Sequence, residues 1–480
     1  MSNSIYAWEI VIGLETHVEL STKTKIFCSC TTEFGGKPNT HCCQICSGQP
    51  GSLPVVNKKV IDYAVKAGLV LNFAINNYSV MARKHYTYPD LPKAYQISQS
   101  NKPLCENGFM ELSDGKKIRI ERIHIEEDAA KLIRSQDLLL IDCNRGGVPL
   151  IEIVTAPDFR SSAEVVEYLE KLQSVLRAVG VSDCRMQEGS LRCDVNISLR
   201  RHGDENFGTR VEIKNLNSFV SVAAAIDYEY ERQVDILESN GIVEQETRSW
   251  NADAFETMRL RGKENADDYR YFSDPDIGVI YISDEEIKKI KSTLPELPEE
   301  KYNRYVNELG IQAADAKLLT KYSKVSDYFE AVYGMVKKPK TVASIMITQM
   351  FALITTETQR ENWSPNTSPQ QLSVLINLIE DGKLNRNLAK RVLTKMLETG
   401  KDAEDFISEE DLTELNPEEL KKLCCTIVTE QQKTVTDYIN GKEKAIKALV
   451  GIVMRETKGR ADALEAEEIL KALIINQQKG

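Results

Sequence analysis

Long apolar runs are missing from this 480-residue sequence. No stretch of about 18 apolar residues occurs, so we expect no segment that spans a membrane. The first residues, MSNSIYAWEIVIG, lack the basic stretch and apolar core of a secretory signal, and they are not rich in arginine. With 11 cysteines and no such signal, we expect reduced thiols and metal ligands rather than a disulfide framework, and a cytoplasmic location.

Several nucleotide-binding and catalytic motifs are missing as well. The sequence has no GxxxxGK(S/T) phosphate loop, no strand–GxGxxG–helix signature, no HExxH and no GxSxG. Any nucleotide must therefore be held by something other than a standard phosphate loop. The net charge of −11 also argues against nucleic-acid binding by bulk charge, so such a contact has to be local.

The sequence is too long for a single hydrophobic core, and its patterns change along the chain. Residues 1–292 mix strand-like alternation with Gly, Pro and Asn turns, which predicts an α+β domain containing a large antiparallel sheet. Pro295 and Pro298 interrupt the chain, and helical periodicity follows. We expect a helical middle domain over 293–406, in which Ser368 before Pro369 starts a helix, and a small helical tail over 407–480.

Residues 10–20 carry an unusual polar face. Apolar and polar side chains alternate there with a period of two, as in a strand with one face in a core. The polar face presents Glu15, His17 and Glu19 in a row. Such a row is either a solvated outer face or the floor of a metal or phosphate site, and strand statistics alone favour the solvated face.

A cluster of cysteines follows this strand. Cys28 and Cys30 form a C-x-C pair, and a C-C-x-x-C segment begins twelve residues later. A C-x-C pair places two thiols on one side of an extended segment, and C-x2-C is the usual knuckle for two more. We predict a closed structural zinc site of four thiolates, formed by Cys28, Cys30, Cys43 and Cys46. Free thiols are the alternative, and His41 and Cys42 are spare ligands.

Two later segments place acids among apolar residues. In residues 122–128, Glu127 shares a face with the isoleucines, while His124 and Glu126 face the other way. In residues 148–154, Glu152 is the one charge among aliphatic side chains. A buried carboxylate is costly unless it is paired or bound to a cation. The alternatives are ion pairs with Arg or Lys, or one Mg²⁺ (or Mn²⁺) site shared by Glu15, His17, Glu127 and Glu152.

Further polar strand faces are candidates for binding a nucleotide. Residues 190–199 and 210–217 alternate in the same way, with polar faces that form either a phosphate site or a wet surface. The candidates for phosphate contacts on these faces are Arg192, Asn196, Lys214 and Asn215. A loop rich in Pro and Tyr, residues 84–99, begins with Lys84, whose ammonium either neutralises phosphate or faces solvent.

Eight motifs in order resemble one known family. They are GLETHVEL, the C-x-C…C-x2-C cluster, KHYTYPDLPKAYQISQ, HIEEDAAK, VPLIEIV with a following PD, EGSLRCDVNISL, EIKNLNSF and DDYRYFSDPD. Together they resemble the B subunit of aspartyl/glutamyl-tRNA amidotransferase. The tail, GKEKAIKALVGIVMRETKGRAD, is similar to that family's tRNA-binding domain. The resemblance covers the chain from end to end.

The resemblance implies an enzyme, its cofactors and its partners. The family's B subunit acts in a heterotrimer with an amidase-like glutaminase A subunit and a small C subunit. It uses ATP to activate the side-chain carboxylate of Glu or Asp misacylated on tRNA(Gln) or tRNA(Asn), and ammonia channelled from the A subunit then gives the amide. ATP, Mg²⁺ and structural Zn²⁺ are the implied cofactors. A tRNA-binding scaffold without catalytic activity is the alternative.

The resemblance also assigns positions. The family's metal positions fall on Glu15, His17, Glu127 and Glu152, and its zinc ligands, absent in some members, fall on the four cysteines named above. Lys84 falls near the family's ammonia route and is a catalytic candidate with Glu127 and Glu152. Lys458 and Arg460 are candidates for contacts with the tRNA backbone. Four positions depart from the usual motifs without removing a ligand: Gln44, Ala130, Gly146 and Ser273.

Overall fold

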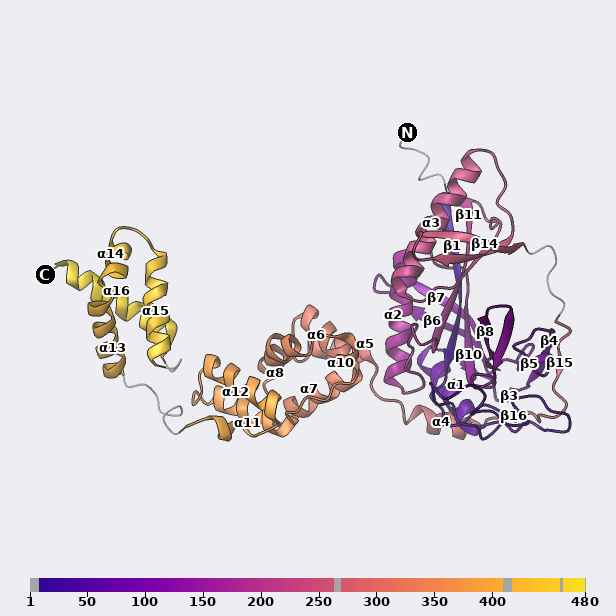
Figure 1. Ribbon diagram of the computed structural model, residues 1–480, viewed down its shortest axis with the longest axis horizontal. Coiled ribbons are helices and arrows are strands. Elements are labelled where there is room, and N and C mark those ends of the chain that lie inside the picture. Colours follow the sequence, from indigo (N-terminus) through magenta and orange to yellow (C-terminus); the bar gives the residue numbers. More distant parts are fainter. Residues whose placement is uncertain (1–7, 263–268, 409–416, 458–460, 480) are drawn as a thin grey trace. The chain divides into compact units, whose positions relative to one another are not determined.

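The computed structural model describes residues 8–262, 269–408, 417–457 and 461–479 (Figure 1). The chain forms two units, residues 1–297 and 298–480. The first unit is built on a large, mostly antiparallel sheet, and the second is helical, which confirms the predicted α+β class. The predicted domain boundaries at residues 292 and 406 stay predictions.

Among the described residues, nine strands form the main sheet of the first unit. In chain order they are β1 (Trp8–Glu19), β2 (Ala74–Ile75), β6 (Cys105–Glu111), β7 (Lys117–Glu127), β10 (Pro149–Thr155), β11 (Leu191–Arg201), β12 (Val211–Lys214), β13 (Glu246–Asn251) and β14 (Glu256–Gly262). They lie in the order β14-β13-β12-β11-β1-β10-β7-β6-β2, and each described pair except β12–β13 is antiparallel. The first strand is therefore central, with β10 on one side and β11 on the other.

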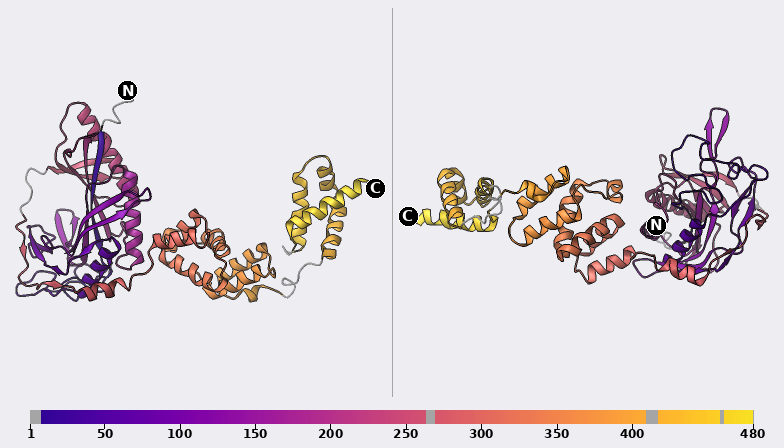
Figure 2. Two further views of the ribbon diagram at one scale, coloured as in Figure 1. Left: turned by 180° about the vertical axis from the view of Figure 1, so that it is seen from behind. Right: turned by 90° about the horizontal axis from the view of Figure 1, so that it is seen from below.

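Three helices pack against the apolar side of the main sheet. They are α1 (Lys58–Val70), α2 (Ser162–Ala178) and α3 (Phe219–Glu238), and each begins after a capping residue whose side-chain oxygen accepts a backbone N–H of the first turn: Asn57, Ser161 and Ser218. Their buried residues form one hydrophobic core with Ile12, Leu14 and Ile197 of the sheet. Figures 1 and 2 show α2 and α3 side by side along the sheet.

Short strands complete the first unit. β4 (Ala82–His85), β5 (Tyr95–Ser98) and β15 (Phe272–Ser273) form a three-stranded sheet that contacts β7 through β5. A hairpin is formed by β8 (Lys131–Ser135) and β9 (Leu138–Asp142), and β3 (Tyr78–Ser79) pairs with β16 (Ile280–Tyr281). The last helix of the unit is α4 (Asp284–Lys291).

The described part of the second unit contains two hydrophobic clusters, one within residues 305–403 and one within residues 420–474. The first cluster is built from α5 (Pro298–Asn307), α6 (Ala313–Thr320), α7 (Ser323–Val336), α8 (Pro339–Ile345), a π-helix (Met346–Met350), α9 (Phe351–Leu353), α10 (Glu357–Glu361), α11 (Pro369–Glu380), α12 (Arg386–Thr399) and a 3₁₀ turn (Ala403–Phe406). The second is built from α13 (Pro417–Glu430), α14 (Gln432–Ile439), α15 (Lys444–Glu456) and α16 (Ala463–Lys479). As predicted, Ser368 caps the helix that starts at Pro369.

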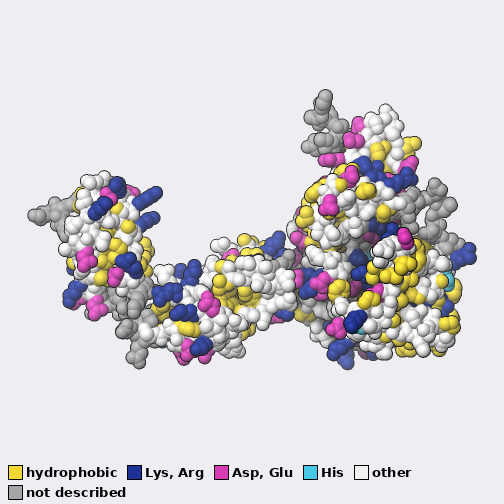
Figure 3. Space-filling model, in the orientation of Figure 1, with side chains coloured by type: hydrophobic (Ala, Val, Ile, Leu, Met, Phe, Trp, Pro, Cys, Tyr) yellow, Lys and Arg dark blue, Asp and Glu magenta, His cyan; other side chains and the backbone are white. Residues whose placement is uncertain are grey.

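Acidic and basic side chains are interspersed over the visible face of each unit (Figure 3). Within the described ranges, no helix has both the length and the apolar character that a membrane span needs.

The contact between α2 and Phe159, which forms an isolated bridge with Ile12 of β1, gives a test of the fold. Phe159 and Tyr168 are fully buried, with ring centroids 5.2 Å apart. Phe159→Ala is expected to lower the free energy of unfolding of the first unit by about 3–5 kcal/mol, because it leaves a cavity in a packed core. Phe34→Ala is the matched control, since Phe34 is 81% exposed, and it should change stability by less than about 0.5 kcal/mol.

The measurement is urea unfolding followed by the fluorescence of Trp8 and Trp250, with Trp363 replaced by Phe in every variant. Equal losses of stability in the two Phe variants would contradict the packing of Phe159 against Tyr168.

Candidate metal centres on and beside the polar sheet face

Three neighbouring strands bring charged side chains into one lateral row. In the β1–β10 register His17 is opposite Glu152, and in the β10–β7 register Glu152 is opposite His124. Directly opposed residues of antiparallel strands point to the same face with Cβ atoms about 5 Å apart. Glu126 lies two residues from His124 on the same strand and therefore shares its face. Strand register thus assembles a cluster of two imidazoles and two carboxylates.

The distances within this cluster are short. His17 Nε2 lies 3.3 Å from Glu126 Oε1 and 3.3 Å from Glu152 Oε2. His124 Nε2 lies 3.1 Å from Glu152 Oε2 and 3.8 Å from Glu126 Oε2. Ligand atoms of His17, Glu126 and Glu152 all lie within 4.8 Å of one another, which is close enough for one metal ion to contact the three. We call these three residues the floor cluster.

Opposite charges dominate the electrostatics of the floor cluster and His124. Burial alone would lower the pKa of His17, but its hydrogen bonds with Glu126 and Glu152 outweigh burial and raise that pKa to about 10. Burial likewise opposes charge on His124, yet the neighbouring Glu152 and Glu126 raise its pKa to about 9. Burial would raise the pKa of Glu126, but its bonds to the two histidines lower it to about 2. The histidines in the same way hold the pKa of Glu152 well below its usual value.

The structure differs from the sequence prediction at Glu127. Because successive side chains of a strand alternate between faces, Glu127 points away from the floor cluster. Both of its carboxylate oxygens contact the Lys93 ammonium, and Ile97 N–H donates to Oε1 over 2.8 Å. Glu127 therefore forms the buried ion pair that the sequence left open as the alternative.

Glu15 also lies outside the floor cluster. It sits two residues before His17, and Asn196 Nδ2 donates to its Oε1 over 3.1 Å. Of the four predicted magnesium ligands, the structure thus brings together His17 and Glu152, and adds Glu126. The period-two alternation had placed Glu126 on the face of His124, although the prediction took Glu127 as the metal ligand.

The predicted phosphate-binding side chains are engaged with neighbouring protein groups. Arg192 forms a two-point contact with the buried Asp128, 2.6 Å at its shorter distance. Lys214 contacts the carboxylate of Asp194 and lies 2.9 Å from that of Glu212. Asn215 donates from Nδ2 to the carbonyl of Trp250 over 3.1 Å.

Lys84 lies on β4 of the three-stranded sheet, and carboxylates of the floor cluster affect the pKa of its ammonium. Its ammonium sits 4.7 Å from the ring centroid of Tyr269 and 5.9 Å from that of Tyr86. Burial acts to lower its pKa, but the nearby Tyr271 and the carboxylates of Glu126 and Glu152 outweigh burial and raise it. A lysine in this position stays positively charged at neutral pH.

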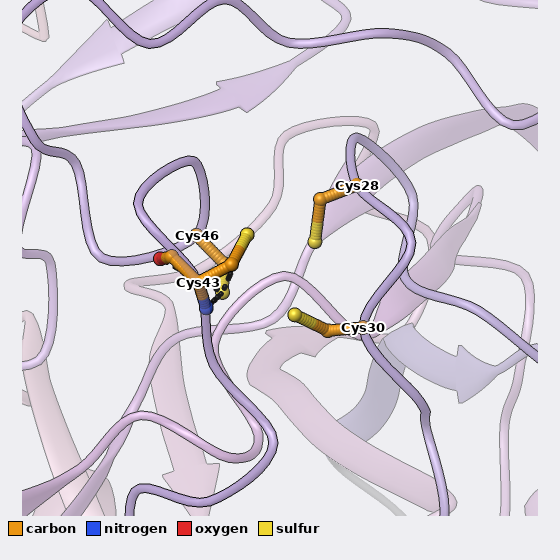
Figure 4. Close-up of side chains that lie close together, drawn as sticks. All are labelled: Cys28, Cys30, Cys43 and Cys46. Atoms are coloured by element: carbon orange, nitrogen blue, oxygen red, sulfur yellow. Dashed lines mark hydrogen bonds between the residues drawn. The ribbon is translucent and has the colours of Figure 1, made fainter.

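Four cysteines form a second candidate metal centre. The thiols of Cys28, Cys30, Cys43 and Cys46 point toward a common space, and their sulfur atoms lie within 4.8 Å of one another (Figure 4). Cys43 N–H also donates to Cys46 Sγ over 3.1 Å, as in a tight knuckle turn. The spare candidates His41 and Cys42 are not part of this group, and the Cys42 thiol donates to the carbonyl of Asn39. The residues predicted as zinc ligands are therefore the ones that the fold groups.

The cysteine segment is tied to the end of the β8–β9 hairpin. Lys25, which is fully buried, donates to Cys46 Sγ over 3.6 Å and to the carbonyl of Cys143 over 3.0 Å. Asn39 bonds to the backbone or side chains of residues 141–143, with distances of 2.8–2.9 Å. The four thiols thus stand beside the segment that leads from the hairpin into β10. The tail candidates Lys458 and Arg460 lie outside the described residues.

Comparisons with known proteins identify the family of this chain. The GatB/GatE catalytic domain family matches residues 10–288, and the GatB domain family matches residues 327–474. The chain is 49% identical over 469 residues to the B subunit of aspartyl/glutamyl-tRNA(Asn/Gln) amidotransferase of Thermoanaerobacter pseudethanolicus, covering 97% of this chain and 98% of that protein. It is 48% identical over 472 residues to the B subunit of the same name from Caldicellulosiruptor saccharolyticus, with the same coverage.

This chain belongs to the GatB family of aspartyl/glutamyl-tRNA amidotransferase B subunits. The match to the GatB catalytic domain includes the floor cluster, Lys84 and the four cysteines. The family resemblance predicted from the motifs is therefore confirmed over nearly the whole chain.

The cysteine cluster gives a prediction about metal content. Cys43→Ser is expected to lower the bound metal of the purified protein from roughly one ion per chain to a trace, because it removes one of four converging thiolates. Amide hydrogen exchange at residues 141–144 should increase at the same time, since this segment is bonded to the cysteine loop. Cys42→Ser is the matched control and should retain the metal. Elemental analysis and exchange mass spectrometry make the two measurements, and equal metal loss in both variants would contradict the assignment.

Proposed function

We propose that this chain uses ATP to phosphorylate the side-chain carboxylate of Glu or Asp misacylated on tRNA(Gln) or tRNA(Asn), and that ammonia then converts the acyl phosphate to the amide. The observation that carries the proposal is the floor cluster, two carboxylates and one imidazole gathered on the polar face of the central sheet. The names of the relatives support the same class of reaction on tRNA.

The chemistry explains why such a site is needed. A carboxylate is a poor acylating agent because its oxygen leaves badly, and phosphorylation supplies a good leaving group. Phosphoryl transfer depends on charge neutralisation and alignment more than on a dedicated protein nucleophile. An acyl phosphate must also be protected from water, so delivery of ammonia through a closed route is part of the proposal.

The floor cluster fits a hard divalent cation. Carboxylate oxygens are the ligands that Mg²⁺ prefers, and the imidazole of His17 also suits Mn²⁺. When bound, the ion would neutralise and align the phosphates of ATP. His17, Glu126 and Glu152 would hold it, and the cationic Lys84 beside them would add positive charge for the transferred phosphoryl group.

The remaining polar side chains of the sheet would bind the phosphates or the tRNA 3′ end. Arg192, Asn196, Lys214 and Asn215 lie on β11, β12 or directly after it, and β11 pairs with β1 beside His17. Their contacts with Asp128, Glu15 and Asp194 hold them in place and would be exchanged in part for phosphate oxygens on binding.

For the thiolate cluster we propose Zn²⁺, because four cysteines leave no open coordination position and suit a structural role.

The proposed partners follow from the reaction. A glutaminase A subunit of the amidase type would supply ammonia, and a small C subunit would complete the heterotrimer. The helical tail, residues 407–480, would bind tRNA, with Lys458 and Arg460 as candidates for the backbone contacts.

The enzyme proposal predicts which acids matter for ATP use. Glu126→Gln and Glu152→Gln should each lower ATP hydrolysis stimulated by misacylated tRNA by about 100-fold in the assembled complex, since each weakens the cation site. Glu121→Gln is the matched control, since Glu121 is exposed on β7, the strand that carries Glu126. It should leave the stimulated ATP hydrolysis unchanged. Amidation and phosphate release are measured together. If Glu152→Ala leaves both unchanged, the chain is the non-catalytic tRNA scaffold instead.

The tail gives a separate prediction. Deletion of residues 407–480 should raise the tRNA concentration needed for half-maximal amidation, while glutamine hydrolysis by the glutaminase partner persists. The reason is that the tail is proposed to bind tRNA rather than to form the glutaminase site. Titration of misacylated tRNA against amide formation and a parallel glutaminase assay test it, and equal loss of both activities would disprove a role limited to tRNA binding.

A further inference from the structure

His124 stands next to the floor cluster but is not one of its three members. Its side chain is 6% exposed, whereas the side chain of His17 at the other end of the row is 22% exposed. The lateral order His17, Glu152, His124 across β1, β10 and β7 places Glu152 between the two imidazoles. Of the two imidazoles in this row, His17 is therefore the more exposed and His124 is buried.

The two ring nitrogens of His124 have different surroundings. Nε2 lies 3.1 Å from Glu152 Oε2, with Glu126 Oε2 at 3.8 Å, while the buried Nδ1 meets no hydrogen-bond partner among the described residues. A buried imidazole with one engaged nitrogen is oriented by that contact. In return, its N–H restricts the rotation of the Glu152 carboxylate. Carboxylates that bind metals are commonly held in this way by a neighbouring donor, and such donors strongly affect metal affinity.

We propose that His124 is a positioning residue, which holds the Glu152 carboxylate in the orientation that binds a divalent cation with His17 and Glu126. The inference rests on the proposed function, because it concerns the cation site assigned there. It predicts that His124 affects how tightly the ion is held without contributing a ligand atom.

Two variants separate orientation from packing. His124→Gln keeps an N–H donor at nearly the position of Nε2, whereas His124→Leu fills similar space without a donor. The probe is Mn²⁺ alone, titrated into the assembled complex and followed by electron paramagnetic resonance. His124→Leu is expected to weaken Mn²⁺ binding by about 10–100-fold, and His124→Gln should restore most of that loss. Glu121→Gln serves as the control, and thermal unfolding verifies that each variant is folded.

The nitrogen coupling of bound Mn²⁺ identifies the ligand. Double-resonance spectra should show a directly bound ¹⁴N in the wild type and in His124→Leu at saturating Mn²⁺, and should lose it in His17→Ala. Unchanged affinity in His124→Leu would overturn the positioning role. Loss of ¹⁴N coupling in His124→Leu would also overturn it, as would a Mn²⁺ affinity of His124→Gln that is no higher than that of His124→Leu. A wild-type complex that binds no Mn²⁺ would instead refute the cation site of the proposed function, and the positioning role with it.

Discussion

Strand register is the constraint on which the polar face of the first unit depends. The pairing of β1 with β10 and of β10 with β7 sets His17, Glu152 and His124 side by side, although they lie more than 100 residues apart at the extremes. With Glu126, which lies two residues from His124, the row contains two carboxylates and two imidazoles. Their opposite charges offset one another, which lowers the free-energy cost of burying them. A slip of one residue in either pairing would turn these side chains into the apolar core and isoleucines toward the polar face.

The segment between β9 and β10 connects the two candidate metal centres within one unit. On one side, Cys143 and Asn144 are bonded to the cysteine segment. On the other, Arg145 donates to the carbonyl of Ala129 over 3.0 Å and lies 3.5 Å from Asp128, the partner of Arg192. The strand that carries Glu152 begins four residues later. The four converging thiols thus lie beside the backbone that leads into the floor cluster, so a metal bound by them would also hold this segment in place.

Much of the fold followed from local patterns. Alternation identified β1, β7, β10 and β11, and the Ser368 and Pro369 pair predicted the start of α11, because these signals depend on neighbouring residues alone. The choice between Glu126 and Glu127 did not follow from the family resemblance. Alternation placed Glu126 on the face of His124, but the sequence prediction took Glu127 as the ligand. The partner of Glu127 in the structure is Lys93, a residue 34 positions away in a loop without regular periodicity.

The amino-acid sequence by itself therefore determined the family, the α+β class, the four converging cysteines and the strands whose polar faces carry the site. Only the tertiary structure decided which acids meet. Whether a carboxylate on a strand faces a cation site or an ammonium depends on the register of its neighbours and on loops that return from elsewhere in the chain. Those long-range pairings decide the partner of each buried charge, and no local pattern of residues encodes them.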